Sequence, residues 1–165
     1  ILGIRRKSTF EGEASMALEF VAEEYQKNRL KNAKKMPEIP TYELLKEGND
    51  RLLLNTGSLI KEILNCQLNG EDPGKLAYFF HRELACQITA ACVKIRELSG
   101  CNKAALSGGV FQNRLLLELT DHMLLEQGFE VLKHQLLPPN DGGIALGQAV
   151  HAMAYLEKSI ETKTI

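Results

Sequence analysis

Apolar residues recur at intervals of three and four along most of the chain, which is the spacing of one face of an α-helix. The longest such stretch begins with Pro73, a residue favoured in the first turn of a helix. Its apolar stripe, which we expect to pack on a sheet or another helix, consists of Leu76, Phe80, Leu84, Ile88, Ala91 and Ile95. In all, the pattern predicts five helices, over residues 11–32, 56–67, 73–98, 113–127 and 143–157.

Short apolar runs without helical spacing predict four strands. The runs 42–45 and 51–54 flank a Gly-Asn-Asp turn signal and predict a hairpin. Two further runs, 103–106 and 129–133, alternate with the last three helices. This alternation predicts an α/β fold with a mixed sheet and flanking helices. Because α/β ligand sites form at the carboxyl ends of strands, we also expect the two Gly-Gly turns of this half to lie at one end of the same sheet.

The composition is that of an ordinary globular domain. Of 165 residues, 44% are hydrophobic and 25% are charged, which excludes a disordered or collagen-like chain. With 20 Lys and Arg against 21 Asp and Glu the net charge is −1, so no overall basic field exists to hold nucleic acid. No apolar run is long enough to cross a bilayer, and no secretion signal is present. We therefore expect no membrane or nucleic-acid partner, and a cytoplasmic location in which the four cysteines stay reduced.

The first Gly-Gly turn, Ser107-Gly108-Gly109, directly follows the predicted strand 103–106. Paired glycines let a ligand approach the backbone, and the free amides at the start of the next helix attract an anion such as a nucleotide phosphate. The segment lacks the Gly-Lys-Ser/Thr of a Walker loop, the G-x-G-x-x-G fingerprint and, because of Ala105, the first glycine of a nucleophile elbow. A tight structural turn and a nucleotide-binding turn therefore both remain open.

The second Gly-Gly turn belongs to the string Pro-Pro-Asn-Asp-Gly-Gly at residues 138–143. Within it, the carboxylate of Asp141 suits a divalent cation that bridges phosphate oxygens, and it equally suits capping the following helix. Among the histidines, we expect His81 at the edge of the core with a hydrogen-bond partner rather than on a metal. No two histidines have the spacing of a helical metal site.

The two turns occur together with further motifs, and in this combination the sequence resembles one family over essentially the whole chain. The motifs are TFEGEA (residues 9–14), FH (80–81), LSGGVFQN (106–113) and LPPNDGGIALGQ (137–148). They resemble the C-terminal part of the NiFe-hydrogenase maturation carbamoyltransferases, the HypF family. The universal tRNA threonylcarbamoyltransferases share the Ser-Gly-Gly turn and a metal-binding Asp, but they usually lack the Phe-Gln-Asn and Pro-Pro-Asn-Asp-Gly-Gly strings.

This resemblance implies the second lobe of an actin/Hsp70-like ATPase fold, in which two α/β lobes close over a nucleotide and a metal. It implies a carbamoyltransferase that passes the carbamoyl group of carbamoyl-adenylate to the C-terminal cysteine of the partner protein HypE. The implied ligands are ATP or carbamoyl-adenylate and a divalent metal. Carried over by position, Asp141 would bind the metal, and the nucleotide-binding residues would be Ser107, Gly108, Gly109, Asn113, Glu11 and Gly12.

The chain begins in mid-pattern with Ile1, so we expect a piece of a longer enzyme, with the lobe over residues 1–157 and a tail over 158–165. The family's histidine pair, first-lobe phosphate loop and upstream modules are absent, and a single lobe cannot exclude water, so the chain alone should be inactive. Apolar surface that would meet those modules favours a homodimer. The alternatives are a nucleotide-binding or regulatory module of the actin-like type and a relative of the tRNA threonylcarbamoyltransferases.

Overall fold

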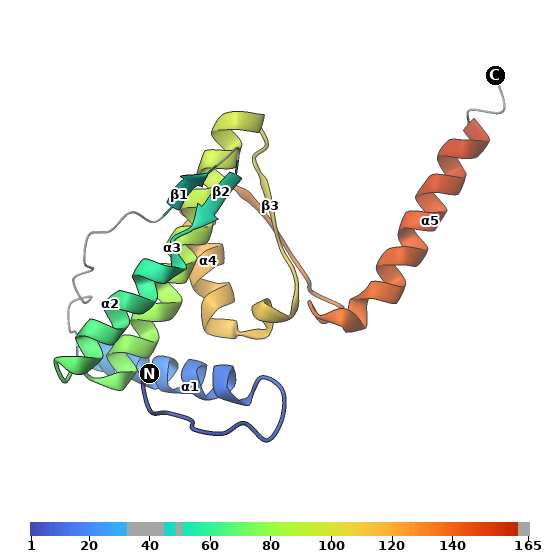
Figure 1. Cartoon of the computed structure of the whole chain (residues 1–165). Coiled ribbons are helices and arrows are strands. Elements are labelled where there is room, and N and C mark those ends of the chain that lie inside the picture. Colours follow the sequence, from blue (N-terminus) through green and yellow to red (C-terminus); the bar gives the residue numbers. More distant parts are fainter. Residues whose placement is uncertain (33–44, 49–50, 162–165) are drawn as a thin grey trace. The chain divides into compact units, whose positions relative to one another are not determined.

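Over residues 1–32, 45–48 and 51–161, which the computed structural model describes, the chain forms an α/β structure in which helices predominate (Figure 1). The helices are α1 (Glu13–Lys31), α2 (Thr56–Leu68), α3 (Pro73–Ser99), α4 (Arg114–Glu126) and α5 (Ile144–Glu161). The strands are β1 (Leu45–Gly48), β2 (Arg51–Leu54), β3 (Lys103–Leu106) and β4 (Glu130–Lys133), and two short 3-10 helices are η1 (Gly109–Gln112) and η2 (Asp141–Gly143). No helix in the described part is long and apolar enough to span a membrane.

The first four helices lie within two residues of their predicted bounds because local signals fix their ends. Asp72 caps α3 by accepting a hydrogen bond from the backbone N–H of Lys75 at 2.8 Å, and Pro73 occupies the first turn. The helix ends at Gly100, whose φ of 71° is the left-handed conformation that glycine adopts without strain. The last helix continues four residues beyond its predicted end, to Glu161, because no glycine or proline interrupts 158–161. The tail predicted from 158 therefore begins inside α5.

By its internal contacts the chain divides into two compact units, which are described separately. The first unit consists of Ile1–Ala104 and Asn113–Val131, and the second of Ala105–Gln112 and Leu132–Ile165. The first unit holds α1 to α4 and the hairpin β1-β2. The second holds both Gly-Gly turns, η1, η2 and α5.

The core of the first unit forms where α1 and α4 pack on α3. Its fully buried members are Ala22, Ala77, Tyr78 and Leu115. Tyr78 also receives the guanidinium of Arg29 over its ring, 5.7 Å from the centroid. A second cluster, Leu59, Ile63 and Phe79, joins α2 to the other side of α3. Burying this apolar surface is the main stabilising contribution to the unit.

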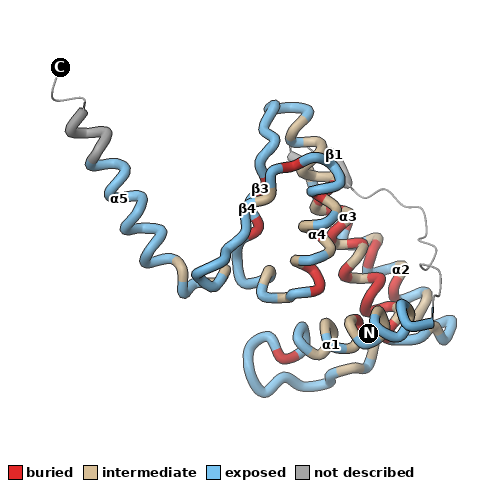
Figure 2. Tube along the Cα trace, turned by 180° about the vertical axis from the view of Figure 1, so that it is seen from behind, coloured by how far each residue is buried: buried red, intermediate tan, exposed pale blue. Residues whose placement is uncertain are grey.

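The burial of α3 differs from the predicted single stripe. Of the six stripe residues only Leu76 is buried, and Ile95 is half exposed. The reason is that α1, α2, α4 and the hairpin all contact α3, so burial runs around the helix and fades toward its C-terminal end, as Figure 2 shows. Polar side chains are consequently enclosed as well, among them His81, Glu83 and Gln87.

The predicted hairpin is present in the described residues. β1 and β2 pair antiparallel, with Leu45 opposite Leu54 and Gly48 opposite Arg51. Of the strand predicted over 42–45, residues 42–44 fall outside the described part of the chain, and β1 extends three residues beyond the predicted end, to Gly48.

The predicted pairing of the two later strands is confirmed. β3 and β4 form a two-stranded parallel sheet, with α4 in the connection between them. Antiparallel and parallel pairs both occur, but in two separate sheets of the described residues rather than in one. At the start of β4, the N–H of Glu130 donates to the carbonyl of Asn102 at 3.0 Å. Near the C-terminal end of α3, the guanidinium carbon of Arg96 lies 4.2 Å from the centroid of the Phe129 ring, a cation–π contact.

The close approach of α1 to α3 depends on the absence of a side chain at Gly74. A Cβ atom there would lie 3.2 Å from Cβ of Tyr25 and 3.1 Å from Oδ1 of Asp72. We expect Gly74→Ala to lower the free energy of unfolding by about 1–3 kcal/mol, because backbone and cap must move to accept the methyl group. Thermal unfolding measures the change.

The matched control for this prediction is Gly57→Ala, since Gly57 lies in α2 with open space around the Cβ position. Alanine has the higher helix propensity, so this variant should be as stable as the wild type or more stable. Equal behaviour of the two variants would show that the contact at Gly74 does not limit the packing of α1 on α3.

Candidate functional site

The first Gly-Gly turn leaves β3 and enters η1 within the second unit. Gly108 has a φ of 98°, in the left-handed region, and its N–H donates to the carbonyl of Pro139 at 2.7 Å. The two Gly-Gly segments, whose glycines are 34 positions apart in sequence, therefore lie side by side, as predicted for turns at one end of the sheet. Gly109 differs from Gly108, because its φ is ordinary and a Cβ atom there would meet no atom within 4 Å.

The hydroxyl of Ser107 forms a hydrogen bond with a histidine that the sequence did not single out. Its Oγ lies 2.8 Å from Nε2 of His134, which immediately follows β4, and both side chains are exposed. Parallel strands end at the same edge of a sheet, so this contact follows from the pairing of β3 and β4. The second unit thus presents a hydroxyl, an imidazole and glycine backbone together.

In the second turn the helix cap is Asn140, not Asp141. Oδ1 of Asn140 accepts a hydrogen bond from the N–H of Gly142 at 3.0 Å. The interpretation of Asp141 as the cap was therefore wrong: both are good capping residues, and the 3-10 turn starts at Asp141 itself, one residue earlier than a cap at Asp141 requires. A side chain would fit tightly at 142 and 143, because a Cβ atom would lie 3.2 Å from Cγ of Pro138 and 3.3 Å from its carbonyl oxygen, respectively.

Asp141 therefore has an exposed carboxylate that the cap does not use. A carboxylate is a good ligand for a hard divalent cation, so the donor type fits the predicted metal. Within the described residues no group of three or more His, Cys, Asp and Glu side chains gathers as a metal site. Asp141 could thus supply one ligand of a metal whose remaining ligands lie elsewhere.

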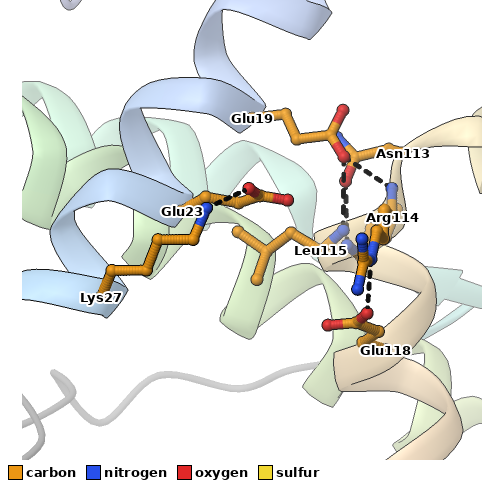
Figure 3. Close-up of polar contacts among 8 residues, drawn as sticks. Glu19, Glu23, Lys27, Asn113, Arg114, Leu115 and Glu118 are labelled. Atoms are coloured by element: carbon orange, nitrogen blue, oxygen red, sulfur yellow. Dashed lines mark hydrogen bonds and ion pairs between the residues drawn. The ribbon is translucent and has the colours of Figure 1, made fainter. Parts of the chain in front are cut away.

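In the first unit, Asn113 uses both ends of its side-chain amide. Its Oδ1 accepts the backbone N–H of Leu116 at 2.8 Å and so caps α4, while its Nδ2 lies 2.8 Å from Nε2 of His81 (the position of Asn113 is seen in Figure 3). His81 is fully buried and its Nδ1 lies 2.8 Å from the carbonyl oxygen of Ala77. The expected hydrogen-bond partner of His81 is confirmed, but the residue lies inside the core rather than at its edge, because α1 and α4 both pack on α3.

Burial lowers the pKa of His81 below its ordinary value. The hydrogen bond to the carbonyl of Ala77 and the negative charge of Glu19 act in the opposite direction and are smaller. His81 is therefore held as the neutral imidazole near pH 7.

Glu19 of α1 places its carboxylate at the start of α4, an arrangement that sequence analysis missed (Figure 3). Its Oε1 accepts the N–H of Arg114 at 2.6 Å and that of Leu115 at 3.4 Å. The first N–H groups of a helix lack partners within the helix and attract negative charge, so the carboxylate stabilises this end. No spacing pattern could reveal a contact between residues 95 positions apart.

The motif at residues 11–13 contains a residue of unexpected importance. Glu11 is exposed, and Gly12 precedes α1 with a φ of 84°, which explains the glycine by backbone conformation. Glu13 is buried and accepts hydrogen bonds from Arg5 and from the backbone and hydroxyl of Thr9. Glu13 is thus the carboxylate of this motif that hydrogen bonds hold in place, and the nucleotide role of Glu11 stays a prediction.

The candidate residues are divided between the units. Ser107, Gly108, Gly109 and Asp141 lie in the second unit, on two segments joined by a hydrogen bond. Glu11, Gly12 and Asn113 lie in the first unit.

A sequence profile for the family described as "Carbamoyltransferase, Kae1-like Domain, second subdomain" matches residues 1–148. The chain is 33% identical over 159 residues to the probable carbamoyltransferase HypF of Methanocaldococcus jannaschii. The aligned region covers 96% of this chain and 18% of that protein. It is 35% identical over 156 residues to the carbamoyltransferase HypF of Synechocystis, covering 90% of this chain and 17% of that protein. The chain thus spans less than a fifth of the length of these relatives.

Two solved structures have the same fold. One is a full-length HypF in the phosphate- and nucleotide-bound form, with 33% identity and a TM-score of 0.77, covering 94% of this chain and 19% of that one. The other is the HypF of T. kodakarensis, with 27% identity and a TM-score of 0.73, covering 94% and 18%.

The capping geometry yields a stability prediction. Asn140→Ala should lower the free energy of unfolding by about 1 kcal/mol, because the N–H of Gly142 loses its acceptor. Asp141→Ala should change it by less than about 0.5 kcal/mol, as is usual for an exposed side chain. Thermal unfolding of both variants measures these changes. A larger loss of stability in Asp141→Ala than in Asn140→Ala would show that Asp141, not Asn140, is the cap.

The lowered pKa of His81 yields a pH prediction. Above the ordinary pKa of about 6.5 both folded and unfolded states carry a neutral His81. As the pH falls below 6.5, the unfolded state gains a proton before the folded state does, so stability decreases toward the lower pKa of the folded state. His81→Gln should lose less stability than the wild type between pH 7 and pH 5 in denaturant titrations. Equal losses would contradict the burial of a neutral imidazole.

Proposed function

The chain belongs to the HypF carbamoyltransferase family, and from this membership we propose that it is the second lobe of a domain that transfers a carbamoyl group from carbamoyl-adenylate to a protein thiol. The acceptor in this proposal is the C-terminal cysteine of HypE, and the role is the maturation of NiFe-hydrogenase in the cytoplasm. The lobe comprises residues 1–157. The thiolate attacks the carbamoyl carbon, the bond from that carbon to the phosphate oxygen breaks, and AMP leaves.

The single observation that carries a nucleotide role is Gly109. Neither its φ nor any close contact among the described residues calls for glycine, whereas Gly108, Gly142 and Gly143 each have a reason within the structure. Gly57 and Gly147 are equally open, but they lie inside helices, whereas Gly109 opens η1 two residues after the hydroxyl of Ser107. A ligand that approaches the backbone closely is a reason to keep this position without a side chain. The nucleotide- and phosphate-bound form of a similar HypF supports the same role for the Ser107-Gly108-Gly109 turn.

The neighbouring groups suit a phosphate. The turn offers backbone N–H groups at the start of η1 and the hydroxyl of Ser107, held by His134. In the proposal these groups of the second unit bind and orient the phosphate. Within the first unit, Asn113, Glu11 and Gly12 are the proposed nucleotide-binding residues. A divalent metal, when bound, would neutralise phosphate charge, with Asp141 as one of its ligands.

The proposed partners are the remaining modules of the same enzyme and HypE. Many large apolar side chains are exposed, including Leu68, Leu98 and Leu136. Such surface is suited to contact with other modules, and in their absence it favours a homodimer. A lobe separated from those modules cannot exclude water from the reacting carbamoyl group, so transfer requires the longer polypeptide.

The test of this function uses the full natural polypeptide that contains this chain, with Asp141→Asn and Gly109→Ala. Both positions are exposed, and neither substitution removes a cap or a buried contact, so the melting temperature should change little. Gly109→Ala should weaken ATP binding at least about tenfold, because the methyl group meets the phosphate. Asp141→Asn should keep its fold and lose carbamoyl transfer, because an amide lacks the charge that a metal ligand supplies.

Gly147→Ala is the matched control, because Gly147 lies in α5 with open space around it. It should change neither ATP binding nor transfer. Full transfer activity in Asp141→Asn would exclude the metal-ligand role. ATP binding without any transfer by the wild type would favour the alternative of a regulatory nucleotide-binding module.

A further inference from the structure

The buried contact between His81 and Asn113 joins the interior of α3 to a residue of the proposed nucleotide site. We propose that His81 is a positioning residue for nucleotide binding: as a neutral imidazole it holds the amide of Asn113 in the orientation that contacts the nucleotide. The inference rests on the nucleotide role proposed for Asn113. It assigns to His81 a function beyond the packing of α3.

The hydrogen bonds fix which ring nitrogen of His81 carries the proton. Nδ1 lies 2.8 Å from the carbonyl oxygen of Ala77, and a carbonyl oxygen can only accept, so Nδ1 is the protonated nitrogen. In the neutral ring Nε2 is then an acceptor, and it faces Nδ2 of Asn113 at 2.8 Å. The donor and acceptor roles along this chain of contacts are therefore determined.

The orientation of the Asn113 amide is fixed from its other end as well. Oδ1 accepts the backbone N–H of Leu116 at 2.8 Å, which places oxygen toward α4 and nitrogen toward His81. An amide nitrogen has two N–H groups, of which His81 takes one. The second N–H and a free lone pair of Oδ1 remain, and the side chain is only half buried, so both are available to a ligand.

Protonation of His81 would break this arrangement. Nε2 would become a donor facing the donor Nδ2 of Asn113, and a flipped amide would face the N–H of Leu116 with its own N–H groups. The charge that reaches the ring from a neighbouring element is the carboxylate of Glu19 on α1, while α4 brings the neutral amide of Asn113. Glu19 favours the protonated ring, but burial acts more strongly in the opposite direction and keeps it neutral.

A double-mutant cycle on the full natural polypeptide tests the inference, with ATP as the probe and calorimetry as the measurement. Asn113→Ser keeps a capping oxygen for α4 but is too short to reach His81 or a ligand. His81→Leu keeps apolar volume and removes the acceptor. Each single variant should weaken ATP binding roughly tenfold, as expected for one well-placed hydrogen bond. The double variant should bind about as weakly as either single variant, because both changes remove the same interaction.

The outcomes separate the inference from the function on which it rests. If Asn113→Ser leaves ATP binding unchanged, the nucleotide role of Asn113 is wrong and the inference is overturned with it. If Asn113→Ser weakens ATP binding while His81→Leu has no effect, the nucleotide role stands and the positioning role is overturned. The positioning role is overturned in the same way if both single variants weaken binding and their two effects multiply in the double variant.

His81→Gln provides the conservative rescue and covers the case in which His81→Leu does not fold. Its side-chain oxygen can accept from Asn113, and it does not titrate. It should bind ATP within about threefold of the wild type near pH 7. The wild type should lose affinity relative to His81→Gln only at a pH low enough to protonate the buried ring, which lies below the ordinary pKa of about 6.5. Binding by His81→Gln near pH 7 as weak as that of Asn113→Ser would overturn the positioning role, because the acceptor for the Asn113 amide would then be without effect.

Discussion

The two hydrogen bonds of the Asn113 amide determine where α4 begins and how it meets α3. One bond caps α4 through the N–H of Leu116, and the other is made to His81 inside α3. Directly after this point Leu115 enters the core of the first unit, and Glu19 of α1 binds the free N–H groups of the same helix end. The start of α4 is thus defined by three helices at once. A displaced Asn113 would disturb a cap, a buried imidazole and an interhelical contact together.

Some glycines of the second unit are explained by the backbone conformation or by packing, and one is not. Gly108 needs its left-handed backbone conformation, and Gly142 and Gly143 pack closely against the proline-rich turn. Gly109 has neither requirement. The proposed nucleotide contact is therefore argued from a residue whose identity the protein's own packing leaves unexplained, beside a hydroxyl and an imidazole that the strand pairing brings together.

Local signals in the sequence were sufficient for the helices, the βαβ connection and the approach of the two Gly-Gly turns. Predictions from these signals were wrong where adjacent residues have similar side chains, and they missed contacts between residues far apart in the sequence. Asn140 and Asp141 are both good caps, and only the backbone geometry selects Asn140. The stripe on α3 was wrong at Ile95 because burial depends on how many elements surround each turn. Glu19 was missed because its partners lie 95 and 96 residues away.

The proposed carbamoyl transfer to a protein thiol is tested most directly by mass spectrometry of the C-terminal peptide of HypE. The peptide is analysed after incubation with the full natural polypeptide and isotopically labelled carbamoyl-adenylate. We expect the labelled carbamoyl group on the terminal cysteine of that peptide. A peptide that stays unlabelled while carbamoyl-adenylate is bound, or merely hydrolysed, would contradict it.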